Sequence, residues 1–232
     1  MTSTRTPRSK RPADKGSSRG GASDRRGTLI LVGAGLAMLA VLVAVVLLTG
    51  GDDEPPAGGG DTTSSEVGAV ELRDDPALPR FAATEDDEAI GQLAPRADGV
   101  EFGGNPVTLL GEGRPSMLVF AAHWCPHCQR EIPLIVEWME GGGTAGLDVT
   151  LVATGTDRDR PNYPPSAWLA RENWASRVLL DDEPGTLAEA YGLDGYPFIV
   201  FVDADGRVTR RASGEVPIDT LQAWATEAGA PS

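Results

Sequence analysis

The stretch Trp124-Cys125-Pro126-His127-Cys128 contains the only two cysteines among the 232 residues of this chain. A bond between these sulfurs would close a very small loop, so it could not tie distant parts of a fold together. No other thiol is present to form a structural disulfide. The pair therefore predicts reversible chemistry between the sulfurs of Cys125 and Cys128 themselves.

The residues around this stretch predict a strand that leads directly into a helix. Residues 117–121 are a short continuous apolar run, as expected of a strand that is buried on both faces. Pro126 suits the first turn of a helix, where its missing N–H is not needed. A helical pattern of apolar residues then continues to Met139 and stops at the three glycines 141–143.

A helix that begins at Cys125 would place this sulfur beside unpaired backbone N–H groups, which together carry about +0.5 of a unit charge. These groups stabilise a thiolate, which is the nucleophilic form of cysteine. We therefore expect Cys125 to be the exposed attacking sulfur. We expect Cys128, one turn further and deeper, to resolve a mixed disulfide. The ring of His127 adds to the stabilisation of the thiolate, and a stabilised thiolate favours the reduced form, so His127 indicates an oxidising pair.

The same stretch offers four donors for zinc: His123, Cys125, His127 and Cys128. Structural zinc sites usually take ligand pairs from separate segments, and four ligands within six residues at a helix start cannot all converge. Covalent haem attachment requires C-x-x-C-H, and Gln129 occupies the last position. We therefore expect neither a metal nor an organic cofactor, and we expect His123 to be an ordinary surface residue.

Strands and helices alternate along the rest of the chain. Residues 100–110 contain turn residues between two short β-type runs, which predicts a hairpin. Later strands are expected at residues 148–153, 178–180, 198–202 and 207–212, and helices at 166–174, 185–191 and 217–228. This order predicts an α/β fold with a mixed central sheet and helices on both faces.

Residues 28–48 form a run of 21 residues without a charged side chain. As a helix this run would be about 31 Å long, which matches the hydrocarbon core of a bilayer. A cleaved signal peptide is the alternative, although its apolar region is usually about 7–15 residues long. Basic residues precede the run, so we expect a single-pass anchor with a cytoplasmic N-terminus and an extracytoplasmic body.

The parts on either side of this span differ in charge. Residues 1–27 carry eight basic and two acidic side chains and are expected to be a disordered cytoplasmic tail. Residues 49–80 are acidic and rich in Gly and Pro, which predicts a flexible linker with a reach of about 30 Å, followed by a folded domain at 81–232. The chain after residue 27 has a net charge of −20, which disfavours a nucleic-acid partner.

A tryptophan and a C-x-x-C pair between a buried strand and a helix resemble thioredoxin, and Pro133 falls where that fold kinks its active-site helix. Gly195-Tyr196-Pro197 resembles the loop that faces the cysteines in that family. The resemblance implies that the Tyr196–Pro197 bond is cis and that this loop binds an extended substrate segment through its backbone. Tyr196 is bulkier than the usual Val, Ile or Thr. Trp124 is expected to pack beside the disulfide.

Residues 124–133 are more similar to the membrane-anchored, extracytoplasmic TlpA/ResA-like branch. Glu131 falls on a glutamate that this branch uses in proton handling. The buried acid of thioredoxin, six residues before the first cysteine, is Val119 here, which leaves the proton role to Glu131 or water. The branch implies a reductant, for instance in cytochrome c maturation. The Cys-Pro-His-Cys sequence resembles the oxidant DsbA, although too few residues separate strand and helix for its helical insertion. The direction stays open.

These resemblances imply a thiol–disulfide oxidoreductase that works outside the cytoplasmic membrane of a bacterium. Its partners would be cysteine-containing extracytoplasmic proteins and a membrane redox partner. A copper- or metal-delivery protein on the same fold is one alternative, but it would need a wider cysteine spacing and a remote histidine. A receptor that only docks peptides on the Pro197 loop is the other alternative.

Overall fold

The computed structural model describes residues 65–110 and 113–230. The predicted cytoplasmic tail, the predicted membrane span at residues 28–48 and the first part of the predicted linker lie outside these ranges. Within them, no helix combines the length and the apolar character needed to cross a bilayer.

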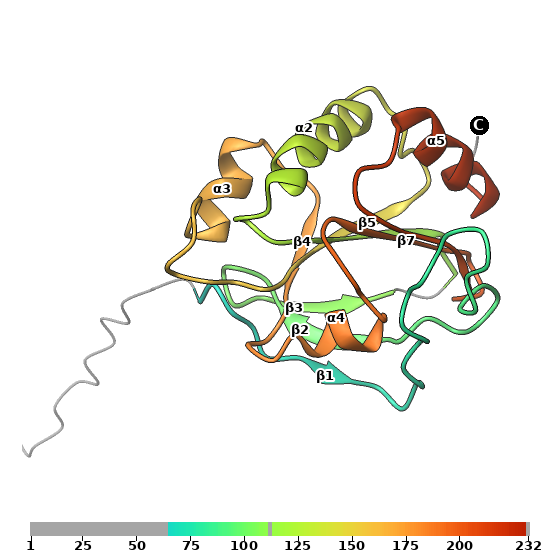
Figure 1. Ribbon diagram of the computed structural model, residues 1–232, viewed down its shortest axis with the longest axis horizontal. Coiled ribbons are helices and arrows are strands. Elements are labelled where there is room, and N and C mark those ends of the chain that lie inside the picture. Colours follow the sequence, from blue (N-terminus) through green and yellow to red (C-terminus); the bar gives the residue numbers. More distant parts are fainter. Residues whose placement is uncertain (1–64, 111–112, 231–232) are drawn as a thin grey trace, which may run out of the picture. The chain divides into compact units, whose positions relative to one another are not determined.

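The centre of the described part is a five-stranded mixed sheet in the order β6-β5-β4-β7-β8 (Figure 1). Three strands run parallel, namely β4 (Ser116–Ala121), β5 (Asp148–Ala153) and β6 (Arg177–Leu180). β7 (Phe198–Val202) runs antiparallel to β4, and β8 (Val208–Ser213) runs antiparallel to β7. The predicted α/β fold with a mixed sheet is confirmed.

Side chains of the sheet alternate between two apolar cores, one on each face. In β4, Met117 and Val119 belong to one core, whereas Leu118 and Phe120 belong to the other. This alternation follows from the period of two residues in a strand. All of β4 is buried, so a strand in this place requires the continuous apolar run from which it was predicted.

Helices cover both faces of the sheet, as predicted. Three of them share the core on one face and lie in the upper part of Figure 1: α2 (Pro126–Glu140), α3 (Pro165–Arg171) and α5 (Ile218–Glu227). The short helix α4 (Thr186–Ala190) contributes to the core on the other face.

Helix α3 ends at Arg171, three residues before the predicted end at Trp174. Asn173 has a φ of 57°, in the left-handed region that commonly ends a helix. The chain folds back at this point, and the backbone N–H of Trp174 donates to the carbonyl of Leu169 at 3.0 Å.

A second, antiparallel sheet has the order β1-β2-β3. The predicted hairpin forms its strands β2 (Ala97–Val100) and β3 (Pro106–Leu109). Strand β1 (Glu71–Leu72) lies in the segment 49–80 that we expected to be linker, and Leu78 in the same segment is buried. The predicted boundary at residue 80 is therefore wrong, because a two-residue strand leaves no periodic signal in a polar sequence.

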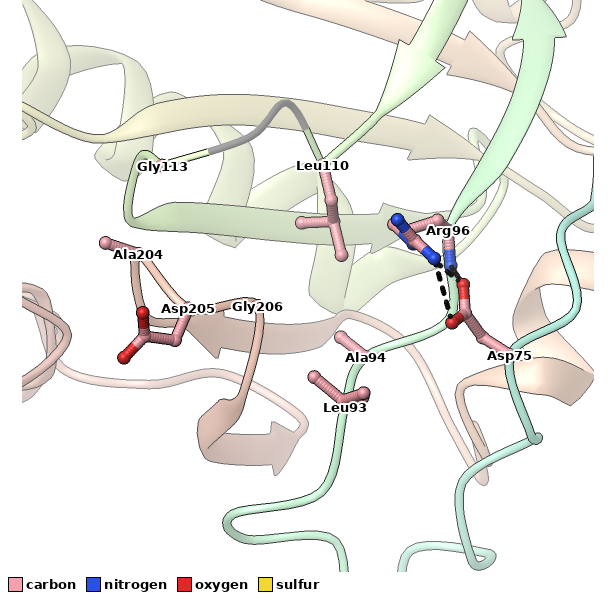
Figure 2. A pocket seen from close by; sticks show the side chains of 9 residues that line it. All are labelled: Asp75, Leu93, Ala94, Arg96, Leu110, Gly113, Ala204, Asp205 and Gly206. Atoms are coloured by element: carbon pink, nitrogen blue, oxygen red, sulfur yellow. Dashed lines mark hydrogen bonds and ion pairs between the residues drawn. The ribbon is translucent and has the colours of Figure 1, made fainter.

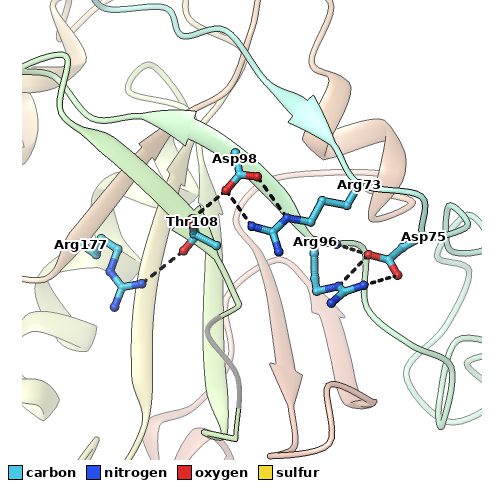
Figure 3. Close-up of polar contacts among 6 residues, drawn as sticks. All are labelled: Arg73, Asp75, Arg96, Asp98, Thr108 and Arg177. Carbon is cyan, nitrogen blue, oxygen red and sulfur yellow. Dashed lines mark hydrogen bonds and ion pairs between the residues drawn. The ribbon is translucent and has the colours of Figure 1, made fainter.

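Polar side chains connect this second sheet with the edge of the central sheet (Figure 3). The Asp98 carboxylate accepts hydrogen bonds from Arg73 at 3.0 Å and from the Thr108 hydroxyl at 2.7 Å. Arg177 of β6 donates in turn to the Thr108 carbonyl at 3.5 Å. Exposed ion pairs of this kind contribute at most about 1 kcal/mol, so these contacts align the strands more than they stabilise them.

A buried ion pair ties the segment before β2 to β8. The side chains of Arg211 and Asp87 are 0 % and 1 % exposed, and Arg211 Nε donates to Asp87 Oδ2 at 2.8 Å. The guanidinium also donates to the carbonyls of Pro79 at 3.0 Å and Tyr191 at 2.7 Å, and it lies 5.7 Å from the ring of Phe81. Four separate segments thus meet at one buried charge.

Candidate active site

Both cysteines lie at the start of α2, a few residues after the end of β4. Cys125 is the N-cap residue, with an extended backbone, and Pro126 occupies the first turn. Both are free thiols. Cys128 is completely buried, as predicted, but Cys125 is only 5 % exposed. Our expectation of an exposed Cys125 is therefore wrong in degree, because the loop before β7 lies against its sulfur.

That loop contains Tyr196 and Pro197, whose peptide bond is cis. The pairing of Phe198 with Phe120 places the start of β7 beside the end of β4. As a result, Cys125 Sγ lies 3.6 Å from the Tyr196 carbonyl oxygen, to which it donates. The two segments that the sequence singled out therefore meet at the sulfur.

Burial distinguishes the two thiols. It raises the pKa of the Cys128 thiol, and the neighbouring Cys125 sulfur raises it further. Cys128 is therefore held as a thiol and has to give up a proton before it can attack. Cys125, at the open end of the helix, is the sulfur that lies nearer to solvent.

Trp124 is fixed by contacts with the segment after β5. Its indole N–H donates to the Gly155 carbonyl at 2.7 Å. Its ring meets that of Tyr196 edge-on, with 5.8 Å between the centroids, and the Arg160 guanidinium lies 4.3 Å from its centroid. Trp124 also packs against the core cluster that contains both cysteines, which is where we expected it.

His123 is buried, with 1 % of its surface exposed, so the expectation of an ordinary surface residue is wrong. The backbone N–H of Asp157 donates to His123 Nε2 at 3.2 Å. The proton must then reside on Nδ1, which lies 2.8 Å from the Pro161 carbonyl. Both partners follow His123 by more than thirty residues, so local sequence could not reveal them. His123 holds the segment that supports Trp124.

Glu131 lies one turn after Cys128 and is 1 % exposed. Burial raises the pKa of its carboxyl group and the charge of Glu215 adds to this effect, while the hydrogen bond from the Val216 N–H opposes both. That N–H donates to Glu131 Oε1 at 3.1 Å. Glu131 is therefore a buried carboxyl group one helical turn from Cys128.

The exposed His127 side chain is held by two residues that the sequence did not indicate. His127 Nδ1 lies 2.7 Å from Glu215 Oε1, and Arg130 Nε donates to the same oxygen at 3.0 Å. The hydrogen bonds from Arg130 and then His127 lower the pKa of Glu215. Glu215 follows Arg130 by 85 residues and His127 by 88 residues. Only the tertiary structure brings it to them.

A buried polar cluster lies behind Trp124, and it too was not predicted. Thr154 hydrogen-bonds both the Asp181 carboxylate and the Tyr196 hydroxyl. Asp181 also accepts the N–H groups of Leu187 at 2.9 Å and Ala188 at 3.2 Å, at the start of α4. The side chain of Tyr196 is thus engaged inside the protein, while its carbonyl faces Cys125.

A pocket lies away from the cysteines (Figure 2). It has a volume of about 270 Å³, with Leu93, Leu110 and the turn at Asp205 in its wall and the Arg96–Asp75 ion pair at its rim. That turn follows the end of β7, whereas the cysteines face its beginning. This pocket therefore does not serve the sulfur chemistry.

The described residues contain no group of three or more His, Cys, Asp or Glu side chains placed to hold a metal ion. What converges at the end of β4 is instead a pair of thiols, a buried carboxyl group and an extended backbone segment. This set of groups can perform thiol–disulfide exchange, in which one sulfur attacks and the other resolves.

Comparison with known protein families agrees with this geometry. The Redoxin family model matches residues 82–225, which is more than half of the chain. The chain belongs to the Redoxin family. This result confirms the resemblance to thioredoxin-like proteins that the motif and the alternation of elements indicated.

Individual relatives are more distant. The chain is 30 % identical over 120 residues to the methylamine utilization protein MauD of Methylobacillus flagellatus, covering 50 % of this chain and 54 % of that protein. It is 27 % identical over 147 residues to a thiol:disulfide interchange protein DsbE homolog of Paracoccus denitrificans, covering 62 % and 73 %. The chain thus spans about half the length of the MauD relative.

Solved structures show the same fold. A putative thiol:disulfide interchange protein DsbE from Chlorobium tepidum superposes with a TM-score of 0.51 at 24 % identity, covering 60 % of this chain and 96 % of that one. A putative protein disulfide isomerase from Bacteroides thetaiotaomicron gives a TM-score of 0.50 at 22 % identity, covering 67 % and 92 %. The chain therefore has a thioredoxin-like fold.

Proposed function

We propose that this protein is a thiol–disulfide oxidoreductase that exchanges disulfides with cysteine-containing proteins through Cys125 and Cys128. The observation that carries the proposal is the position of Cys125, at the start of α2 and 3.6 Å from the Tyr196 carbonyl, with Cys128 buried behind it. Family membership and relatives named as thiol:disulfide interchange proteins support it.

The exchange proceeds in two steps when a partner disulfide is reduced. The Cys125 thiolate attacks one sulfur of the partner disulfide, whose S–S bond breaks as a Cys125–partner bond forms. The released partner sulfur leaves as a thiolate and takes up a proton. Cys128 then loses its proton and attacks Cys125, which releases the second partner thiol and leaves a Cys125–Cys128 disulfide. Two electrons pass to the partner, and the reverse sequence oxidises it.

The surrounding residues have distinct roles in this scheme. Glu131 accepts the proton from Cys128, since it is a buried carboxyl group one turn away. Trp124, Tyr196 and Pro197 bind an extended segment of the partner, whose backbone pairs with the loop before β7. His127 would stabilise the Cys125 thiolate to the extent that its ring is released from Glu215. No metal or organic cofactor takes part.

The location follows from the sequence beyond the described residues. The apolar run at 28–48 would anchor the protein in the cytoplasmic membrane with the folded domain outside. Its partners would then be extracytoplasmic proteins, and a membrane redox protein would restore its oxidation state. Fusion of a reporter enzyme after residue 64 tests this topology, and activity of a cytoplasm-specific reporter would contradict it.

Trapping of mixed disulfides tests the chemistry. The Cys128→Ser variant should accumulate partners bound through Cys125, visible as higher-mass species that disappear on reduction, whereas Cys125→Ser should accumulate none. An insulin-reduction or RNase-reoxidation assay should lose its activity in both variants. Equal rates in Cys125→Ser and wild type would favour a receptor that only docks peptides, and a tightly bound metal in the isolated protein would favour metal delivery.

A further inference from the structure

His127 is part of a small charge cluster beside the cysteines. Its ring would stabilise the Cys125 thiolate and make the pair oxidising, if it acted alone. In the structure the ring is held by Glu215, at 2.7 Å from Nδ1 to Oε1. The imidazole that the motif provides is therefore engaged with a carboxylate rather than free to approach the sulfur.

Arg130 belongs to the same cluster. Its Nε donates to Glu215 Oε1 at 3.0 Å, a second guanidinium nitrogen makes a shorter contact with this oxygen, and that nitrogen lies 2.8 Å from His127 Nδ1. A guanidinium can only donate. The imidazole Nδ1 can accept from Arg130 when it carries no proton and can donate to Glu215 when it does. In either form Arg130 and His127 converge on one carboxylate oxygen.

The charge of a Cys125 thiolate also acts on Arg130. The pKa of its guanidinium is raised mainly by the hydrogen bond with Glu215, and the charge of Cys125 contributes to the same shift. Arg130 therefore lies close enough to stabilise a Cys125 thiolate. Arg130 and His127 thus share a single carboxylate partner.

The backbone on either side of Glu215 is fixed. The Val216 N–H donates to the buried Glu131 carboxylate at 3.1 Å, and the Gly214 N–H donates to the Pro197 carbonyl at 2.8 Å. The loop that carries Glu215 is therefore attached to both halves of the site, α2 and the loop before β7. Its carboxylate is positioned by the fold and is not a freely moving surface group.

We propose that Glu215 is a positioning residue that draws His127 and Arg130 away from the Cys125 sulfur and thereby makes the Cys125–Cys128 pair less oxidising than its Cys-Pro-His-Cys sequence alone would be. The inference rests on the proposed exchange activity. It reconciles the oxidising pair that the motif indicates with the reductant that the resemblance to the TlpA/ResA-like branch implies, through a residue outside the motif.

The equilibrium with glutathione measures this effect directly. Glutathione disulfide takes two electrons from the Cys125–Cys128 dithiol, which gives the intramolecular disulfide and two molecules of reduced glutathione. Glu215→Gln keeps the size of the side chain and removes its charge. We expect the equilibrium to shift about tenfold toward the dithiol, which corresponds to about 30 mV for a two-electron couple. Arg130→Gln should shift it in the opposite direction.

Glu227→Gln is the matched control, because Glu227 is also an exposed carboxylate paired with an arginine, Arg210, at 2.7 Å. It should leave the equilibrium unchanged. A measurable but unaltered constant in Glu215→Gln would overturn the inference and leave the exchange activity standing. Failure of every variant and the wild type to form the Cys125–Cys128 disulfide would instead overturn the proposed function.

A double-variant cycle separates positioning from direct charge repulsion. If Glu215 acts through the two cations, Glu215→Gln should shift the equilibrium less than about twofold in a His127→Ala/Arg130→Gln background. Persistence of the full shift in that background would mean that the carboxylate acts on the thiolate directly, which contradicts a positioning role.

Discussion

The Val216 N–H donates a hydrogen bond to the Glu131 carboxylate at 3.1 Å, although 85 residues separate the two in the sequence. This bond joins α2 to the loop before α5, one helical turn from Cys128. It satisfies one lone pair of a carboxyl group that is otherwise removed from water. A partly satisfied buried acid of this kind is costly for the fold, and such positions are commonly functional.

Glu131→Gln should raise the stability of the protein at neutral pH and impair its activity. A carboxyl group whose pKa is raised in the folded state contributes stability below its unfolded value, and that contribution is lost as the pH rises through the folded value. Glutamine does not ionise, so the loss of stability with rising pH disappears. Its amide oxygen can still accept the hydrogen bond from the Val216 N–H. Urea unfolding at acidic and neutral pH checks the first effect, because the stability gain should appear only at neutral pH.

The same variant should slow the attack of Cys128 on a mixed disulfide by about a hundredfold, since it has lost its proton acceptor. Stopped-flow measurement of partner release, at several pH values, follows this step. Raising the pH should partly restore the rate of partner release in the variant, because hydroxide can take the proton instead. An unchanged rate at neutral pH would exclude Glu131 as the acceptor.

The two thiols should differ in their reaction with an alkylating reagent. Cys128 is fully buried and its pKa is raised by that burial. We expect Cys125 to react faster by on the order of tenfold or more in the reduced protein at neutral pH. Peptide mass spectrometry after a short pulse of iodoacetamide quantifies the ratio. Denatured protein is the control, in which the two rates should become similar.

Replacement of His123 should affect mainly the stability of the protein, and replacement of His127 mainly its redox equilibrium. His123→Ala removes the hydrogen-bond partner of the Asp157 N–H and of the Pro161 carbonyl, together with a ring that is only 1 % exposed. Losing these contacts and the packing of the ring should cost about 1–3 kcal/mol. We expect a clear loss in the free energy of unfolding. His127→Ala should change stability by less than about 0.5 kcal/mol but make the pair more reducing. Denaturant titrations and glutathione equilibria of both variants check this contrast.

Asp87→Asn should destabilise the fold by about 3–5 kcal/mol, because it leaves the buried Arg211 charge without its partner. Burial opposes ionisation of Asp87, but the hydrogen bonds from Arg211 and the Ala89 N–H outweigh it and lower the pKa. The stability of the wild type should therefore fall as the pH drops through this lowered value. Calorimetry across the acid range measures both effects.

The exposed Glu227–Arg210 pair provides the comparison for this prediction, with side chains that are 44 % and 33 % exposed. Glu227→Gln should cost about 0–1 kcal/mol. A similar cost for both variants would mean that the Arg211 guanidinium is rehydrated when Asp87 is replaced.

Elements with a strong local pattern were predicted with accurate boundaries. The run that forms β4 is apolar because both of its faces are buried, and Pro126 and Gly141 mark the limits of α2. Strand β1 was missed because it is only two residues long and depends on its pairing with β2, in which Leu72 lies opposite Ala97. Such pairing energy comes from a partner strand and leaves no trace in the local sequence.

By itself, the sequence indicated the two sulfurs as the candidate reacting atoms and determined that they lie on one turn of a helix. The spacing of Cys125 and Cys128 and the proline between them place two sulfurs on the first turn of a helix, because helix geometry acts over only a few residues. What surrounds these sulfurs was decided by the tertiary structure alone. The partners of His123, His127 and Glu131 come from segments 34 to 88 residues away, and the burial and charge that tune a thiol arise only when the sheet brings those segments together.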